Sequence, residues 1–309
     1  MASVVLTHLF CSTVLLGVMT VAWGQDRPAC PVDASWRLVD GVSDEFGASR
    51  LDDSKWDDWA ASFPGRRASG NACEKCEDGF RFMPKNVSVR NGELVLTARL
   101  LEDVEMTREI AYLRHAPYAT SIVKSKQKVL YGYFEARAKT MKACVSNAFW
   151  LYDPHSDNPV VKFREGDVSE EIDIFEVCGK ADHFDSHHDE TKTYFNTVHF
   201  YCTPYLEGVV NFKKEDRKPR SFKTKVCFDF AEDYHVYGLL WTKERIQWLL
   251  DGRVVAERAN NGDFVRPLHV TLDSEVFATW FGRPYPADLP AEFKVDYVRV
   301  WQQPVAGSE

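Results

Sequence analysis

Three carboxylates in one strand-like segment are the residues of this sequence best placed to do chemistry. Residues 170–176 read Glu-Glu-Ile-Asp-Ile-Phe-Glu, although carboxylates form strands poorly and repel one another on a shared face. The two-residue period of a strand places Glu171 and Asp173 on one face. A regular strand would send Glu176 to the opposite face, so we predict a β-bulge between Glu171 and Glu176 that returns it.

Two carboxyl groups that face each other across a short gap meet the requirement for retaining glycoside hydrolysis. One group acts as the nucleophile and the other as the acid/base, and retaining enzymes hold the two about 5–5.5 Å apart. Asp173 would lie between Glu171 and Glu176 and tune them. The alternative is a solvent-exposed acidic edge strand. The apolar residues that alternate with the acids argue against it, because they require a buried opposite face.

Strand-like runs surround this segment on both sides, and helical periodicity is almost absent. Each run is rich in β-branched or aromatic residues and is bounded by Gly, Pro, Asn or Asp. Asn91-Gly92 and Asp251-Gly252 separate neighbouring runs as hairpin turns that accept positive φ. Many short strands without alternating helices predict an all-β sandwich or jelly roll in a single domain. The runs are residues 86–90, 93–99, 121–125, 129–139, 147–152, 171–177, 194–201, 234–241, 245–250, 268–276 and 293–301.

Composition and charge narrow the class of protein. The formal net charge of −8 argues against a protein that binds nucleic acid, which needs clustered Lys and Arg. The aromatic content of 13% suits a β protein or a sugar-binding groove. One basic run, residues 211–225, is either a solvated loop or a surface that steers a sulfated polyanion.

The first 24 residues have the pattern of a secretory signal peptide. The stretch from Val4 to Ala22 is mostly apolar and uncharged, and small residues at Ala22 and Gly24 suit a cleavage site. We therefore expect cleavage after Gly24, a secreted extracellular protein without a membrane segment, and one domain over residues 25–309. The alternative is an uncleaved membrane anchor, because the apolar stretch is nearly long enough to span a bilayer.

Secretion makes the cysteines candidates for disulfides. The chain has eight cysteines, one of which leaves with the signal peptide, so at least one thiol stays unpaired. We predict a disulfide between Cys202 and Cys227, because they bracket a loop-like stretch. Asn86 begins the only Asn-x-Ser/Thr sequon, which predicts an N-linked glycan there.

The segment Glu-Ile-Asp-Ile-Phe-Glu at 171–176 resembles the bulged signature of glycoside hydrolase family 16, and the resemblance covers about residues 35–302. The flanking matches are Trp36, Asp44-Glu45-Phe46, Leu51-Asp52, Lys55-Trp56, residues 131–137, residues 148–151, residues 234–238 with Trp241, and residues 296–301. That family is a β-jelly-roll group that cleaves β-linked polysaccharides with retention.

The resemblance implies a concanavalin-like β-jelly-roll sandwich of two antiparallel sheets with a substrate groove. It implies that Glu171 is the nucleophile, Glu176 the acid/base, and Asp173 the partner that holds the proton balance of the nucleophile. It implies no organic cofactor, and a structural Ca²⁺ away from the groove for which no ligands are assigned here.

Further residues are candidates for sugar binding. By the resemblance, Trp150 lies under the sugar at the cleavage point, where an aromatic ring stacks on C–H faces; core packing is the alternative. Trp59 and Arg66, in an irregular stretch, are candidates for groove contact. His199 either binds sugar or supports an acid, or is a buried structural histidine. Glu275, in a stretch that looks like the agarase and porphyranase branch of the family, would accept hydrogen bonds from sugar hydroxyls.

The sequence thus predicts a secreted, endo-acting, retaining glycoside hydrolase whose partner is a polysaccharide, as a monomer. The expected substrate is an agar- or porphyran-type galactan. The first alternative is an endo-β-1,3-glucanase. The others are a transglycosylase, or a carbohydrate-recognition protein that has lost catalysis, although all three acids are present here.

Overall fold

The computed structural model of the chain describes residues 33–58, 80–102, 118–153, 168–181, 188–202, 221–260, 262–278 and 280–303. The predicted signal peptide, Trp59 and Arg66 lie outside these residues. Almost every described element is a β-strand, which confirms the predicted all-β class.

The strands are β1 (Arg37–Leu38), β2 (Trp56–Asp57), β3 (Phe80–Phe82), β4 (Val87–Arg90), β5 (Glu93–Leu100), β6 (Tyr118–Val129), β7 (Gly132–Lys139), β8 (Ser146–Tyr152), β9 (Val168–Cys178), β10 (Thr193–Cys202), β11 (Ser221–Lys225), β12 (His235–Trp241), β13 (Arg245–Leu250), β14 (Arg253–Ala259), β15 (Leu268–Glu275) and β16 (Ala291–Gln302). The short 3₁₀ helices are η1 (Pro84–Asn86), η3 (His188–Lys192) and η4 (Pro286–Asp288).

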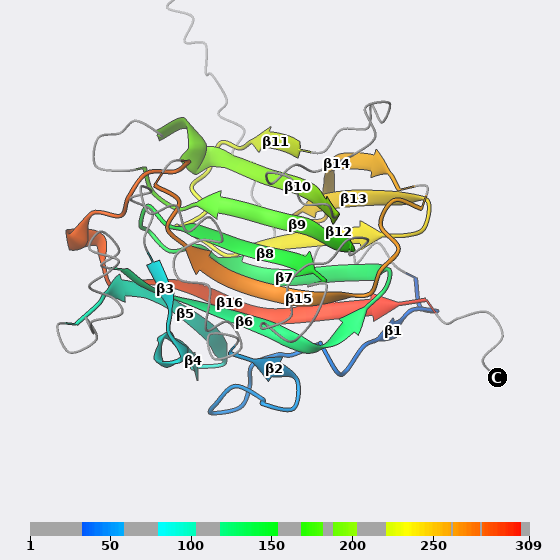
Figure 1. Ribbon diagram of the computed structural model, residues 1–309, viewed down its shortest axis with the longest axis horizontal. Helices are drawn as coiled ribbons and strands as arrows, with labels where there is room; N and C mark the ends of the chain where they lie inside the picture. Colours follow the sequence, from blue (N-terminus) through cyan, green and yellow to red (C-terminus); the bar gives the residue numbers. More distant parts are fainter. Residues whose placement is uncertain are drawn as a thin grey trace, which may run out of the picture.

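The long strands form two layers joined at one edge. One layer has the order β11-β10-β9-β8-β15-β6, and the other has the order β5-β16-β7-β12-β13-β14. The layers connect where β6 pairs with β5, and these neighbours are all antiparallel. In Figure 1 the strands of both layers run roughly along the long axis of the molecule, and those of one layer alternate in the view with those of the other. This is the predicted sandwich.

The core lies between the two layers. The ring of Phe175 in β9 stacks on Tyr237 of β12 at a centroid distance of 4.0 Å and meets Phe293 of β16 edge-on at 5.9 Å. All three side chains are fully buried. Such aromatic pairs stabilise a core beyond the effect of their buried area. The apolar residues of β9 therefore hold that strand against the second layer and leave its other face for the acids.

Two predicted hairpin turns are confirmed. Asn91 and Gly92 have φ values of 57° and 79°, and Asp251 and Gly252 have values of 49° and 76°. Positive φ at both central residues gives a turn whose twist matches the flanking strands. Among the described strands, β1, β2, β3, β11 and β14 lie outside the predicted runs, and the predicted run 129–139 is divided by a turn at Tyr131 between β6 and β7.

The predicted disulfide between Cys202 and Cys227 is wrong, because the register of β10 with β11 keeps the two residues far apart. β10 ends at Cys202, whereas Lys225, two residues before Cys227, pairs with Thr193 at the start of β10. The intervening strand spans about 30 Å at about 3.3 Å per residue. The two cysteines therefore belong to opposite ends of the same hairpin.

The glycan predicted at Asn86 does not fit the folded chain either. The side chain is 3% exposed. Its Nδ2 donates a hydrogen bond to the carbonyl of Thr97 at 3.0 Å, and its Oδ1 accepts one from Nε of Arg99 at 2.9 Å. A glycan is bulky and attaches at Nδ2 on the surface, so it would have to displace this buried contact. Separately, no helix in the described ranges is long and apolar enough to cross a membrane.

Candidate active site

The register of β9 contains the predicted bulge. Consecutive residues Phe149 and Trp150 of β8 pair with Phe175 and Asp173 of β9, which leaves Ile174 as an extra residue. The pairing of β9 with β10 slips over the same stretch. One extra residue reverses the alternation of faces beyond it. The prediction of a bulge between the two glutamates is therefore confirmed.

The bulge puts the three carboxylates on one face of β9. Residues directly opposite each other in an antiparallel pair share a face. Each carboxylate accordingly has a cross-strand neighbour on β10, and these pairs are Glu171 with His199, Asp173 with Thr197, and Glu176 with Phe195. On β8 the corresponding neighbours are Tyr152, Trp150 and Ala148. The structure thus brings together the three predicted acids and two of the predicted sugar contacts, Trp150 and His199.

Three buried side chains satisfy the backbone that the bulge displaces. The carbonyl oxygen of Ile174 accepts hydrogen bonds from the hydroxyl of Tyr194 at 2.9 Å and from Nδ2 of Asn196 at 2.6 Å. The carbonyl oxygen of Asp173 accepts one from Nε1 of Trp248, in the second layer, at 2.8 Å. Buried carbonyls left without donors are costly. No sequence motif assigns a role to these three residues; an amide inside an apolar strand, at Asn196, is the signal that could have identified one of them.

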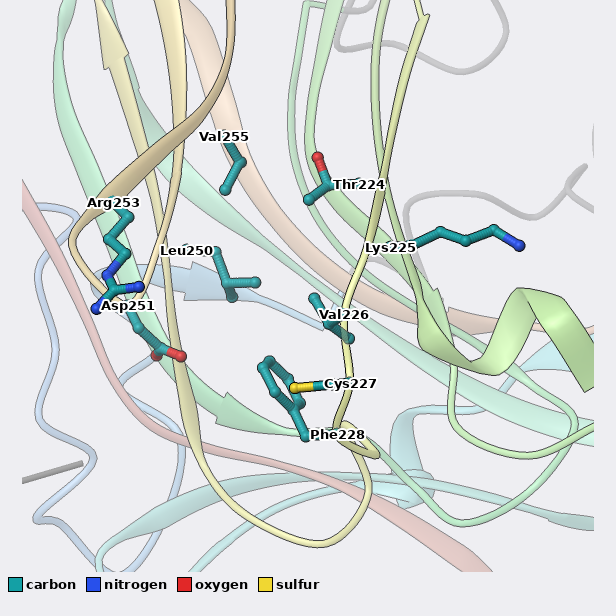
Figure 2. Close-up of a pocket in the computed structure, with 9 residues that line it drawn as sticks. All are labelled: Thr224, Lys225, Val226, Cys227, Phe228, Leu250, Asp251, Arg253 and Val255. Atoms are coloured by element: carbon teal, nitrogen blue, oxygen red, sulfur yellow. The ribbon is translucent and has the colours of Figure 1, made fainter. Parts of the chain in front are cut away.

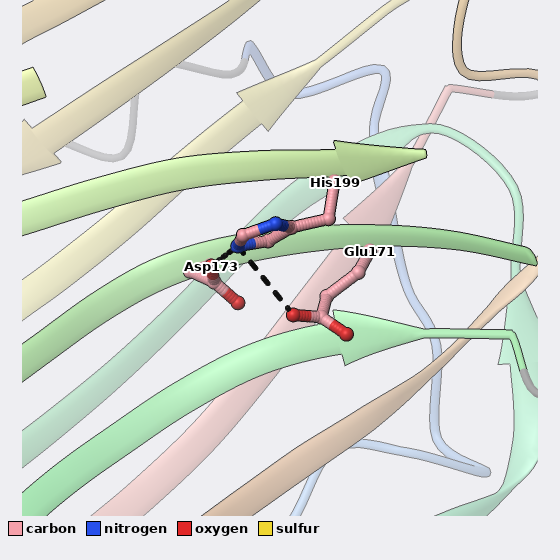
Figure 3. Close-up of side chains that lie close together, drawn as sticks. All are labelled: Glu171, Asp173 and His199. Atoms are coloured by element: carbon pink, nitrogen blue, oxygen red, sulfur yellow. Dashed lines mark ion pairs between the residues drawn. The ribbon is translucent and has the colours of Figure 1, made fainter. Parts of the chain in front are cut away.

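His199 lies between two of the carboxylates. Its Nε2 is 3.2 Å from Oδ2 of Asp173 and 3.8 Å from Oε1 of Glu171. Figure 3 shows the imidazole, which comes from β10, pointing toward both acids of β9. The side chain of Asp173 is 5% exposed and that of His199 is 32% exposed. When protonated, the imidazole forms an ion pair with Asp173, so His199 can balance negative charge at this face.

This group is also where the described residues could gather a metal ion. Ligand atoms of Glu171, Asp173 and His199 all lie within 4.8 Å of one another. The group coincides with the predicted catalytic acids. It does not correspond to the structural Ca²⁺ that we expected away from the groove, and that expectation stays a prediction without assigned ligands.

The pKa of Glu176 is strongly perturbed by its surroundings. Burial raises the pKa of this carboxyl well above its ordinary value, and neighbouring negative charges raise it further. Those charges belong to Asp173, Glu171, Asp273 and Glu275, in decreasing order of effect. Asp273 reaches Glu176 across β8, because Ala148 pairs with both residues and its side chain is small. Glu176 therefore keeps its proton to a higher pH than an ordinary carboxyl does.

Trp150 and Glu275 are two further predicted sugar contacts among the described residues, and Lys223 lies on the same side of the sheet. Trp150 is 6% exposed and packs against Tyr152 at 5.4 Å between ring centroids, so its ring is mostly covered. Glu275 ends β15 and is buried on the same face as the acids, opposite Ser146 of β8. Lys223 of β11 lies over the ring of Phe195 at 4.9 Å from its centroid. It belongs to the basic run of residues 211–225, whose last five residues form a strand.

A pocket of about 470 Å³ opens elsewhere, between residues 224–228 and the β13–β14 hairpin (Figure 2). Among the described residues that line it, Asp251 is the only one with a carboxylate. Oδ2 of Asp251 lies 2.8 Å from Nδ1 of His235, and its Oδ1 accepts a hydrogen bond from the backbone N–H of Val236 at 2.9 Å. A pocket with one engaged carboxylate does not supply the pair of acids that glycoside hydrolysis needs.

Known proteins resemble this chain over nearly its whole length. The family model described as the GH16 domain of beta-porphyranases A–D matches residues 36–303. Beta-porphyranase B of Zobellia galactanivorans is 24% identical over 295 residues, which cover 92% of this chain and 90% of the relative. Its crystal structure covers 86% of this chain and 92% of its own, with a TM-score of 0.62 at 23% identity, and therefore has the same fold.

Two other relatives are named for different activities. The kappa-carrageenase of Pseudoalteromonas carrageenovora is 29% identical over 318 residues, which cover 94% of this chain and 70% of the relative. Glucan endo-1,3-beta-glucosidase A1 of Niallia circulans is 26% identical over 297 residues, covering 89% of this chain and 39% of the relative.

The family model covers every described strand, including the bulged β9 and the neighbours that place its three acids. The resemblance noted from the sequence is confirmed. The protein belongs to glycoside hydrolase family 16 and is a glycoside hydrolase.

Proposed function

We propose that this glycoside hydrolase is an endo-acting retaining enzyme whose nucleophile is Glu171 and whose acid/base is Glu176. The observation that carries the proposal is the bulge in β9, which puts both carboxyl groups on one face with Asp173 between them. Two carboxyls on one face, one with a raised pKa, are the arrangement that glycoside hydrolysis uses.

The roles of Glu171 and Glu176 follow from the surroundings of their carboxyl groups. Glu176 keeps its proton to higher pH than an ordinary carboxyl, so it donates that proton to the glycosidic oxygen as the bond breaks. Glu171 attacks the anomeric carbon and forms a covalent glycosyl-enzyme. Glu176, now ionised, then removes a proton from water, which attacks the same carbon and releases Glu171. Two displacements at one carbon retain its configuration.

Asp173 and His199 support the nucleophile. The carboxylate of Asp173 lies beside Glu171 on the same strand face, and the imidazole of His199 lies within 4 Å of both. A protonated imidazole there stabilises the negative charge that returns to Glu171 when the glycosyl-enzyme breaks down. Both residues position charge and need not touch the sugar.

The proposed substrate is a β-linked galactan of the agar or porphyran type. The matching family model is that of porphyranases, and two of the relatives carry galactan-cleaving names, porphyranase and carrageenase. Lys223, on the face of Phe195 and Glu176, adds a cation that can attract a sulfate ester. The second candidate, a β-1,3-glucan, is favoured by the likeness to the endo-1,3-beta-glucosidase.

A screen of the purified protein against porphyran, agarose, kappa-carrageenan and laminarin tests this substrate. We expect new reducing ends and shortened chains from porphyran or agarose. The matched control is Glu171→Gln, which keeps size and removes the nucleophile, and it should release none. Release from laminarin alone would overturn the galactan and leave the retaining mechanism standing. Redistributed chain lengths without new reducing ends would identify a transglycosylase.

We also propose that the chain is a secreted monomer that needs no cofactor for the chemistry. The support is the signal-like pattern of residues 1–24 and a mechanism that uses only side chains of this chain. Amino-terminal sequencing of protein from the culture medium of an expressing cell should begin at Gln25. Retention in the membrane fraction would favour the uncleaved anchor instead.

A further inference from the structure

Two buried cysteines meet at the end of the strand pair that carries Glu176. Cys178 is the last residue of β9, and Cys144 precedes the first residue of β8 by two positions. Their Sγ atoms lie 3.9 Å apart, and each residue is 1% exposed. In the structure both are thiols. Cys178 donates to the carbonyl of Lys180, and Cys144 donates to that of Phe281, each at 3.0 Å.

Hydrogen bonds made by Asn147 hold the backbone segments that carry these thiols next to each other. Nδ2 of Asn147 donates to the carbonyl of Val145 at 2.9 Å and to that of Val177, beside Cys178, at 3.3 Å. Its Oδ1 accepts a hydrogen bond from the backbone N–H of Met141 at 3.1 Å. A Cβ added at Gly179 would lie 1.8 Å from the carbonyl oxygen of Met141. The close approach of the two cysteines is therefore built into the backbone.

The surroundings are apolar. Phe195 and Phe281 are buried against the two sulfurs, and Phe277 and Trp280 pack on the same cluster. Thiols buried in such surroundings are poor nucleophiles, which argues against a catalytic role. A disulfide is uncharged and donates no hydrogen bonds, so this environment accommodates it.

We propose that Cys144 and Cys178 form a disulfide in the mature protein, which joins β8 to β9 beside the acid/base. An S–S bond is about 2.05 Å long, so the sulfurs must approach by about 1.8 Å. Rotation about the two Cα–Cβ bonds moves each sulfur without moving the backbone. Ser146 pairs with Cys178, and Ala148 pairs with Glu176. Cys178 is two residues after Glu176 on β9, so the bond would lie next to the catalytic carboxyl on the same face of that strand.

The bond forms by exchange with a small-molecule disulfide such as oxidised glutathione, while the folding chain still exposes both thiols. A deprotonated cysteine attacks one sulfur of glutathione disulfide, whose S–S bond breaks and releases one glutathione thiolate. The second cysteine, also deprotonated, then attacks the mixed disulfide and releases the second. The two protein sulfurs lose two electrons, and the two glutathione thiolates gain them and take up the two protons.

Peptide mapping tests the proposal directly. The full-length protein is refolded in a glutathione redox buffer, unfolded in denaturant with iodoacetamide and no reductant, and digested. We expect a linked peptide pair containing Cys144 and Cys178. Cys227 supplies the internal control, because it is an exposed free thiol that lines the pocket of Figure 2 and should carry the alkyl group. Alkylation of both Cys144 and Cys178 would overturn the proposal.

Thermal unfolding provides a second, independent readout that does not depend on which polysaccharide the enzyme cleaves. Reductant should lower the Tm of the oxidised wild type by about 5 °C or more, because the cross-link restricts the unfolded chain. Cys144→Ala should unfold at the lower temperature with or without reductant. Cys227→Ala, the matched control, should keep the wild-type response. A wild-type Tm that reductant does not move would contradict the proposed bond.

Discussion

Glu176 shows how one residue obtains an unusual acidity from its neighbours. It shares a face with Glu171 and Asp173 along β9, and with Asp273 and Glu275 across β8. Each neighbouring carboxylate makes it harder for Glu176 to ionise. The pKa of Glu176, the proposed acid/base, is thus raised by carboxylates of two strands, β9 and β15, of which only β9 carries the acidic motif.

Replacing Glu171 and Glu176 with alanine should affect the activity of the enzyme in different ways. Glu171→Ala should abolish turnover, because no covalent intermediate can form. Glu176→Ala should keep residual activity on aryl glycosides with good leaving groups, since these need no acid. Azide should restore its rate and give a glycosyl azide of retained configuration. Rate measurements with and without azide check this. Full activity in Glu171→Ala would contradict the assignment.

Asp273 should set the pH range of the acid. Replacing it with Asn removes a negative charge that raises the pKa of Glu176. The alkaline limb of kcat/KM against pH reports the pKa of the essential acid in the free enzyme, so Asp273→Asn should move that limb to lower pH. Asp296→Asn, on the other layer and paired with Arg137, should leave it in place. An unmoved limb in Asp273→Asn would mean that Asp273 does not reach the acid.

At the scale of single elements, the bulge in β9 is the feature on which the site depends. If residues 171–176 formed a regular strand without the bulge, Glu176 would point into the core. The hydroxyl of Tyr194 and the amide of Asn196 both bond the displaced carbonyl from the core side. The catalytic geometry is therefore held by residues that no substrate would touch.

Asn196→Ala should test that dependence. Loss of the amide removes one of two donors to a buried carbonyl that still accepts from Tyr194, which should cost about 0.5–1.5 kcal/mol of stability. It should also lower kcat far more than it changes KM, because a shift of about 1 Å in a catalytic group costs about a hundredfold. Asn86→Ala is the matched control, because Asn86, the last residue of η1, is also a buried amide that donates to a backbone carbonyl, that of Thr97 on β5. Equal kcat losses in the two variants would contradict a specific role for the bulge.

The sequence predicts those parts of this site that are local in the chain. The alternation of acids and apolar residues in 170–176 was enough to predict the bulge and the shared face, whereas the family was predicted from the resemblance of residues 171–176 and their flanking segments. The approach of Asp273 to Glu176 depends on the strand order β9-β8-β15, which no local pattern encodes. The predicted disulfide between Cys202 and Cys227 was wrong for the same reason. The positions of two cysteines on either side of a loop do not reveal the register of the strands, here β10 and β11. β11 was missed because its lysines made it look like a solvated loop.

At the scale of the whole molecule, buried carboxyls should make stability depend on pH. Glu170 points away from the active-site acids, and burial raises its pKa to about 7, although hydrogen bonds from the backbone N–H groups of Arg266 and Val265 limit the shift. Glu176 is raised in the same direction. A carboxyl whose pKa is higher in the folded state binds its proton more tightly there than in the unfolded chain. Stability therefore falls as pH rises.

The free energy of unfolding should accordingly decrease between about pH 4.5 and pH 7 as these groups ionise. Urea unfolding at pH 5 and pH 7.5 measures the decrease. Glu170→Gln should make it smaller, because the amide oxygen can still accept from the backbone and carries no charge. Glu257→Gln, at an exposed position of β14, should leave it unchanged. A stability that rises over this interval in the wild type would refute the assignment.

The central claim is that Glu171 and Glu176 cleave a β-linked polysaccharide by two displacements at one carbon. Proton NMR of the first-formed reducing ends, on whichever polysaccharide the screen identifies, tests it most directly. The account predicts that the β anomer appears first and that the α anomer follows only by mutarotation. Initial release of the α anomer would mean a single displacement by water, and it would contradict the account.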